Sequence, residues 1–316
     1  MADTTPPAGL LRPLGFGELF DRAVTLYVRN FLAFSGIVLV PLLPLGIVLY
    51  FIDAGQTGQM SAILDAMRGK HPLDPITAQV SSSYYGWLAL LIFLTLLLVP
   101  FALNAVALGV ARLYMGFPVD ARACYVAALR RFWPTIGLIV MWIVILSSAY
   151  GALVVLVAIF VGIGIAILSS VQAAAIVMIA IGALLGIAMV GVMVQLGMAM
   201  NFAMYSLVIE NRGVFDSIGA GFSRIFSRAE FWRSMLFAFC AGLIYFAGAL
   251  AAGGFGLIAL VLHWPVLTVL VETVTRTVLY AFGVVLFAVY YYDVRIRREG
   301  LDVEAGLQSL VAPATA

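Results

Sequence analysis

The sequence predicts an all-α integral membrane protein: a bundle of six transmembrane helices with three short amphipathic helices on its cytoplasmic side. Three observations lead to this prediction. Hydrophobic residues make up 64% of the 316 residues and charged residues only 10%, whereas soluble domains carry about 25% charged residues. No charged residue lies between Arg131 and Glu210, a run about four times the ~20 residues that one helix needs to cross a bilayer. Arginines gather between the apolar segments rather than within them.

Six segments are long and apolar enough to cross a membrane. They are predicted near residues 31–52, 85–110, 134–160, 173–208, 234–260 and 269–291. Residues 14–300 are expected to form one transmembrane domain. A disordered, Pro-rich tail is predicted over 1–13 and a cytoplasmic tail over 301–316. The first tail lacks the basic start and apolar core of a secretory signal peptide.

Positive charge predicts the orientation of the spans. Most of the 17 Lys and Arg residues lie before the first span, between the second and third, between the fourth and fifth, and after the sixth. Basic residues near span ends favour the cytoplasm, so both termini are expected inside the cell. The same parity assigns two spans, not three, to the uncharged run, with a turn near residues 161–172. Each of these two helices exceeds the bilayer thickness, which predicts tilt or a cytoplasmic extension.

Three cytoplasmic segments resemble one another. The pattern Asp, aromatic residue, Arg-x-Phe occurs at residues 21–31 and again at 216–226, and the middle segment keeps Arg-Arg-Phe at 130–132. Each segment precedes two spans. We therefore hypothesise a threefold repeat of one short helix and one transmembrane hairpin.

Apolar residues at helical spacing predict that the first and third segments are helices at the membrane surface. Phe20, Ala23 and Tyr27 would face the acyl chains, and Asp216 is expected to act as an N-cap. A cluster of arginines would then face the lipid headgroups: Arg22, Arg29, Arg130, Arg131, Arg224 and Arg228. These helices either brace the entrances of the spans or sense lipids or a partner.

Motifs for catalysis are missing from the sequence. It contains no His-Glu-x-x-His, no Gly-x-Ser-x-Gly and no P-loop, which are the marks of zinc proteases, serine hydrolases and many NTPases. Two histidines and two cysteines are too few for a Cys-based metal site. We expect no enzymatic activity, no cofactor and no metal, and the formal charge of +2 gives no reason to expect nucleic-acid binding.

A few polar residues are predicted at membrane depth, where burial is costly. Glu272 and Arg276 are spaced i, i+4 and can pair on one helix face. They form either a structural ion pair or, with Asn104, a gated or substrate-binding site. Asn104 can equally bond a neighbouring helix, as can Gln195 and Asn201 in the uncharged run.

Two strings near the ends of the chain carry a family resemblance. They are Leu-Gly-Phe-Gly-Glu-Leu-Phe-Asp-Arg-Ala at 14–23 and Tyr-Tyr-Tyr-Asp-Val-Arg-Ile-Arg-Arg-Glu-Gly-Leu-Asp at 290–302, where Gly300 is expected to end a helix. They resemble a poorly characterised group of bacterial membrane proteins, similar to the membrane domain that precedes the catalytic domain of some glycerophosphoryl diester phosphodiesterases. The resemblance implies a six-helix bundle in the bacterial inner membrane. The phosphodiesterase barrel itself is not found in this sequence, so its activity is not expected.

The residues and the resemblance together favour a non-catalytic scaffold or accessory module of the bacterial cell envelope. The alternative is a transporter or permease for a small or lipidic molecule. Expected partners are membrane lipids and either a membrane protein or further copies of this chain.

The orientation predicts that residues 68 and 228 lie on opposite sides of the membrane. Cysteines introduced as Arg68→Cys and Arg228→Cys should differ in their reaction with a membrane-impermeant maleimide applied to intact cells. Only the cysteine at 68 should be labelled before the cells are opened. Labelling of both from one side would show the topology to be wrong.

Overall fold

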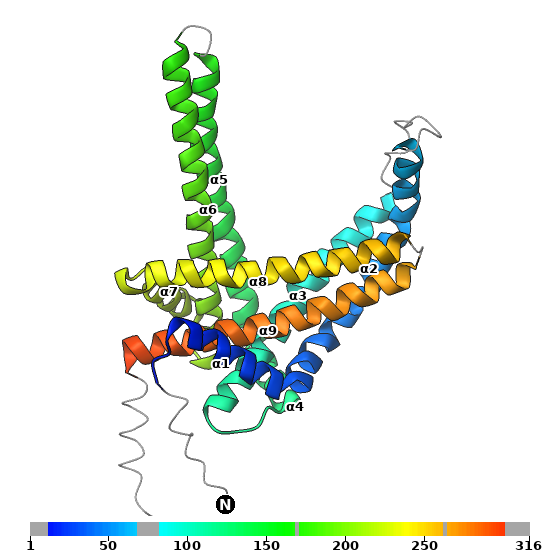
Figure 1. Cartoon of the computed structure of the whole chain (residues 1–316). Coiled ribbons are helices and arrows are strands. Elements are labelled where there is room, and N and C mark those ends of the chain that lie inside the picture. The colour runs from blue at the N-terminus through cyan, green and yellow to red at the C-terminus, as the bar shows by residue number, and fades with distance from the viewer. Residues whose placement is uncertain (1–11, 68–81, 168–170, 262–263, 301–316) are drawn as a thin grey trace, which may run out of the picture. The chain divides into compact units, whose positions relative to one another are not determined.

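The computed structural model of the chain describes residues 12–67, 82–167, 171–261 and 264–300 (Figure 1). Within these ranges every regular element is a helix, and six helices are long and apolar enough to cross a membrane. The predicted all-α class is confirmed. Most of both predicted tails and the segment 68–81 lie outside the described residues.

The described helices follow the order short, long, long three times over. The short helices are α1 (Phe16–Arg29), α4 (Ala121–Arg130) and α7 (Val214–Ile225). The long helices are α2 (Phe31–Met67), α3 (Ser82–Tyr114), α5 (Phe132–Ala166), α6 (Gln172–Ile209), α8 (Arg228–Val261) and α9 (Pro265–Glu299). This is the order that the hypothesis of a helix-plus-hairpin repeat requires; common ancestry of the three parts stays a hypothesis.

Helix ends differ from prediction in ways that packing explains. The turn expected over 161–172 is much shorter, because α5 continues to Ala166 and α6 begins at Gln172. Gly164, expected in the turn, lies within α5 and packs closely on α6: a Cβ there would lie 2.8 Å from the Ile179 side chain. Asp216 is not the N-cap of α7, since Gly213 occupies that position and Asp216 lies in the first turn. Gly300 does end α9, with the left-handed φ of 66° that favours glycine.

The chain divides into two compact units, residues 1–130 with 243–316 and residues 131–242. In the first unit α9 packs against both α2 and α3, and its Tyr290 and Tyr291 are completely buried. The ring of Tyr114 on α3 stacks on Tyr292 of α9 with centroids 4.2 Å apart. Small residues bring these helices close: a Cβ at Gly46 of α2 would lie 2.8 Å from the Thr273 hydroxyl of α9.

In the second unit α5 and α6 run side by side as a long hairpin, and α7 packs on α6 (Figure 1). Burial along α6 is uneven: most residues from Gln195 to Val208 are buried, whereas few are buried before that point. The exposed part, residues 172–194, measures roughly 34 Å at 1.5 Å per residue, close to the ~30 Å of a bilayer core. The excess length of α6 is therefore better explained by an extension under α7 than by tilt.

Each short helix packs on a long helix that ends a hairpin. Helix α4 packs on α3 and α7 packs on α6, while α1, which has no hairpin before it, packs on α9 (Figure 1). The prediction that the apolar face of α1 contacts acyl chains is therefore partly wrong, because Leu19, Ala23 and Tyr27 are buried in the protein. The edge of the Tyr27 ring packs against Phe282 of α9. These contacts favour the bracing interpretation of the short helices.

A proline explains how α4 is held against α2. Pro41 lies inside α2 and has no N–H, so the carbonyl of Ile37 loses its helical donor. The hydroxyl of Tyr125 on α4 donates a hydrogen bond to that carbonyl. Burial of this hydroxyl raises the pKa of Tyr125 to about 12. A polar backbone group that would be costly in a membrane is satisfied in this way.

Two glycines of α7 provide a test of its packing on α6. Gly221 lies against the backbone of α6, where a Cβ would collide with the Ala199 carbonyl oxygen and lie 2.8 Å from the amide nitrogen of Ala203. Nothing lies within 4 Å of a Cβ at Gly219. Gly221→Ala should lower the unfolding free energy in mixed micelles by about 1–3 kcal/mol through overpacking.

Gly219→Ala is the matched control. It should leave that free energy unchanged or raise it by up to about 1 kcal/mol, because alanine is the better helix former. Equal effects of the two substitutions would show that α7 does not pack on α6 as described.

Candidate functional site

Glu272 and Arg276 form the predicted ion pair on α9, with Nη2 of Arg276 donating to Oε1 of Glu272. The two side chains remain 35% and 40% exposed. Among the described residues, neither makes a polar contact with any other side chain. Four N–H groups of the guanidinium and the second carboxylate oxygen therefore stay available.

Three aromatic side chains indicate the depth of this pair. Phe51 and Trp87 stack with their ring centroids 4.8 Å apart, and Trp264 is 59% exposed just before α9. Tryptophan rings favour the headgroup level, and Phe51 stacks on one of them. Helical rise along α9 places Glu272 roughly 12 Å below Trp264. Thr273 contacts Gly46 of α2, and Gly46 lies roughly 8 Å below Phe51 on that helix. The pair thus lies in the upper part of the acyl region, just below these rings.

The face of α9 that carries the pair continues toward α8. Leu279 and Gly283 follow at i+7 and i+11 from Glu272, and they contact Gly248 and Tyr245 of α8. The two helices run antiparallel, so the next residues of α8 at the level of the pair come from 249–254. That stretch reads Ala-Leu-Ala-Ala-Gly-Gly and provides no polar side chain. Leu250 is 60% exposed and so does not cover the pair from this side.

Asn104, the third residue proposed for this site, is completely buried on α3. Gly109, five residues further on, packs against Phe34 of α2, whereas the ion pair is level with Gly46. Helical rise therefore separates Asn104 from the pair by roughly 10 Å along the bundle. No hydrogen bond among the described residues joins it to either charge, so the structure does not place Asn104 in this site.

The proposed arginine cluster is divided between the two compact units. Arg29, Arg130 and Arg228 are exposed. Arg22 and Arg131 are half-buried, and Arg131 donates a 2.9 Å hydrogen bond to the carbonyl of Asn211.

The prediction is wrong for Arg224, which is 4% exposed. Arg224 pairs with Glu210 at 2.7 Å and donates to the hydroxyl of Ser206 at 2.6 Å. Arg212 lies 2.6 Å from the other oxygen of the same carboxylate. Arg224 shares with Ser217 and Gly221 the face of α7 that packs on α6, which is why it does not reach lipid.

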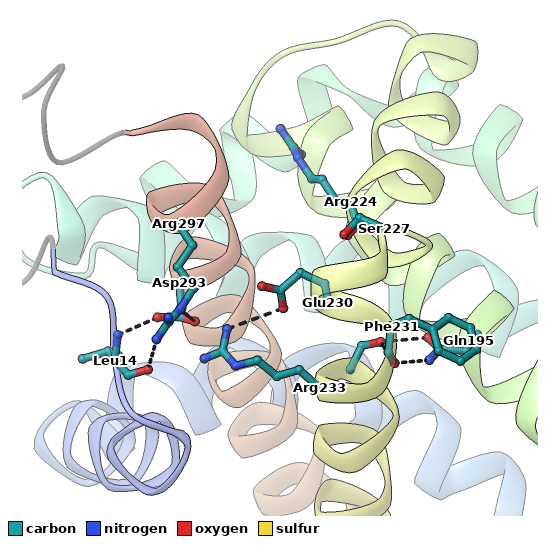
Figure 2. A network of polar contacts seen from close by, with 10 residues as sticks. Leu14, Gln195, Arg224, Ser227, Glu230, Phe231, Arg233, Asp293 and Arg297 are labelled. Carbon is teal, nitrogen blue, oxygen red and sulfur yellow. Dashed lines mark hydrogen bonds and ion pairs between the residues drawn. The ribbon is translucent and has the colours of Figure 1, made fainter.

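The two strings that carry the family resemblance meet in the first unit (Figure 2). The backbone N–H of Leu14 donates to Oδ1 of Asp293 at 2.6 Å, and Nε of Arg297 donates to Oδ2 at 3.1 Å. Arg297 also donates to the carbonyl of Leu14. Asp293 is buried, at 1% exposure. We call these contacts the terminal clamp, because they join segments 279 residues apart.

The start of α1, next to the clamp, is capped by its own side chain. Glu18 accepts a 2.8 Å hydrogen bond from the N–H of Gly15 and pairs with Arg12 at 2.8 Å. The Gly15 N–H and then Arg12 lower the pKa of Glu18. The stabilisation from this carboxylate is present above the ordinary glutamate pKa of about 4.3 and is lost as pH falls through the lowered pKa.

In the second unit Gln195 joins α6 to α8, as its predicted packing role requires (Figure 2). Its Nε2 donates to the carbonyl of Phe231 at 2.7 Å, and the hydroxyl of Ser234 donates to its Oε1 at 2.9 Å. Asn201 instead donates within α6, to the carbonyl of Gly197. Gln195 therefore serves packing between helices, whereas the hydrogen bond of Asn201 stays within one helix.

No family model, no characterised protein and no solved structure matches the chain. Within the described ranges, His, Cys, Asp and Glu form no group of three or more that could hold a metal ion. The partly exposed Glu272–Arg276 pair is therefore the candidate site, and it is supported by the positions of its two side chains.

The terminal clamp is tested by removing its buried carboxylate. Asp293→Ala leaves the Leu14 N–H and the Arg297 guanidinium without their acceptor, and should lower the unfolding free energy by about 3 kcal/mol. Backbone amides near Leu14 should also lose protection from hydrogen exchange.

Glu299→Ala is the matched control, because it breaks a second i, i+4 pair of α9, the 2.7 Å contact of Arg295 with Glu299. This more exposed pair should contribute less than about 1 kcal/mol. A clamp variant that behaves like this control would contradict a stabilising role for Asp293.

Proposed function

We propose that the protein is a non-catalytic scaffold or accessory module of the bacterial cell envelope. It would be a multi-pass protein of the inner membrane with both termini in the cytoplasm. The observation that carries the proposal is the α5–α6 hairpin, an uncharged pair of helices whose apolar surface is left open by the rest of its unit.

The contrast between the long helices supports this proposal. In the most apolar stretches of α2 and α9, 39% of residues are buried within the chain, against none for α5 and 6% for α6. Leu184 and Ile187 are 66% and 71% exposed on α6, and Val155 is 59% exposed on α5. A hairpin of this kind contributes little to its own bundle and presents a long surface to lipids, to a partner protein or to further copies of the chain.

The polar contacts also agree with a scaffold. Asp293 joins α1 to α9, Gln195 joins α6 to α8, and Arg224 with Glu210 joins α7 to α6. Each of these groups is engaged in holding helices together. The family resemblance in the two terminal strings implies a six-helix membrane bundle, and it gives no reason to carry over the phosphodiesterase activity.

A second candidate function is a transporter or permease for a small or lipidic molecule. The observation that favours it is the Glu272–Arg276 pair, whose two charged side chains lie at membrane depth and remain partly exposed. Intramembrane charges of this kind commonly mark substrate pathways.

Site-specific photocrosslinking distinguishes a docking hairpin from one that only contacts lipid. Benzoylphenylalanine introduced at Leu184 and at Ile187, which share one face of α6, should yield one protein adduct of the same mass after irradiation of native membranes. Phe93 on α3 is also exposed, at 60%, and is the matched control position. Adducts with lipid alone at all three positions would contradict a scaffold acting through this hairpin.

A further inference from the structure

We propose that Glu272 and Arg276 form a headgroup-binding site for a zwitterionic aminophospholipid of the leaflet at the Trp264 end of α9. The ligand would offer an ammonium to Glu272 and a phosphate to Arg276. This proposal concerns the first compact unit and does not depend on the scaffold function proposed for the hairpin of the second.

The first step is that the pair lacks a protein environment suited to charge. It lies below the aromatic side chains in a region where charged groups are costly. The two charges contact only each other among the described residues, and more than a third of each side chain is exposed. The buried pair of α7 and α6 differs: Arg224 and Glu210 are under 10% exposed and engage further partners.

The second step is that α9 is open on the side that carries the pair. The side that carries Thr273 and Thr277 is closed, because both residues are buried and Thr273 packs against Gly46 of α2. The pair lies on the side toward α8, where the facing stretch consists mostly of alanine and glycine. Gly253 and Gly254 are exposed and have no atom within 4 Å of a Cβ position. A lipid headgroup can therefore reach the charges from this side.

The third step is the order of the charges. Glu272 lies one helical turn nearer the Trp264 end than Arg276, an axial offset of roughly 6 Å. In an aminophospholipid the ammonium is the outermost group and the phosphate lies deeper, next to the glycerol. The carboxylate is thus placed for the ammonium, and the guanidinium, which binds phosphate in a bidentate way, is placed for the phosphate.

The same geometry predicts the selectivity. An ethanolamine headgroup satisfies both charges, because its ammonium donates hydrogen bonds to Glu272. A choline headgroup carries the same charge without N–H donors and is expected to bind less well. A glycerol headgroup has a phosphate for Arg276 but leaves Glu272 facing an anionic lipid, so it is expected to bind least well.

The test uses the full chain reconstituted in phosphatidylcholine vesicles, with trace spin-labelled phosphatidylethanolamine, phosphatidylcholine or phosphatidylglycerol as probes. Electron paramagnetic resonance gives the fraction of each probe that the protein immobilises. The ethanolamine probe should be enriched over the choline probe by roughly threefold or more, as one charge-assisted contact implies. Glu272→Gln should abolish this preference and increase association of the glycerol probe. Arg276→Met should reduce association of all three probes, because each of them offers its phosphate to Arg276.

The matched control is the exchanged pair Glu272→Arg with Arg276→Glu. It keeps the i, i+4 ion pair and the net charge. The protein should therefore keep the wild-type melting temperature if the pair contributes to stability. The order of charges is reversed, and the preference for ethanolamine should be lost while the fold is kept. An exchanged pair that retains the wild-type preference would overturn the proposal, as would wild-type protein that shows no preference.

One further arm separates a lipid from a soluble ligand with the same chemistry. Millimolar glycerophosphoethanolamine in the buffer should not displace the labelled lipid, because it lacks acyl chains to hold it at this depth. Displacement would overturn the assignment to a lipid. None of these outcomes bears on photocrosslinking of the α5–α6 hairpin, so the two proposals can fail separately.

Discussion

The bilayer imposes one requirement on this chain: each backbone polar group at membrane depth must find its partner inside the protein. Long apolar helices meet it for their own backbone, except where proline removes a donor. At Pro41 the carbonyl of Ile37 is released, and the hydroxyl of Tyr125 supplies the missing hydrogen bond from α4. A short helix outside the spans is thereby fixed at one place on a long one. Arg224 of α7 bonds Ser206 and Glu210 of the α6 segment, and Asp293 of α9 bonds the backbone of Leu14 just before α1.

The bracing follows a cyclic order. Helices α4 and α7 pack on the helix that precedes them in the chain, and α1 completes the set by packing on α9. This order explains why the first and last strings of the domain meet. The segment at Leu14 enters α1, α1 packs on α9, and Asp293 of α9 bonds the backbone of Leu14. Motifs at the two ends of the sequence thus belong to one contact, as they would if a brace-and-hairpin unit had been repeated three times.

Composition and charge were enough to predict the helical class, the six spans and the short helices, because lipid leaves few alternatives to helices. Spacing alone also predicted the Glu272–Arg276 pair, and glycine chemistry predicted the end of α9 at Gly300. These features depend on residues within about one helical turn of each other. They need no knowledge of neighbouring helices.

Features that depend on neighbours could not be predicted in the same way. Helical periodicity shows that α1 and α7 have two faces, but it does not show whether protein or lipid covers the apolar one. In α7 the face of small residues, including Ser217 and Gly221, packs on α6. Arg224 lies on the same face and is buried there. Phe215 remains 76% exposed although it is the larger apolar residue. Close backbone approach selected the small face, and hydrophobicity is a poor measure of that property.

Burial distinguishes the Arg224–Glu210 ion pair from the Glu272–Arg276 ion pair. Arg224 and Glu210 are 4% and 8% exposed, and each has a further partner in Ser206 or Arg212, which is the arrangement that makes a buried ion pair tolerable. Glu272 and Arg276 have only each other among the described residues and remain several times more exposed. Stability alone would be served by apolar residues at these two positions, since α9 already packs through its other side. A pair that the helix does not need, at a depth where it is costly, is better explained by a ligand that carries the complementary charges.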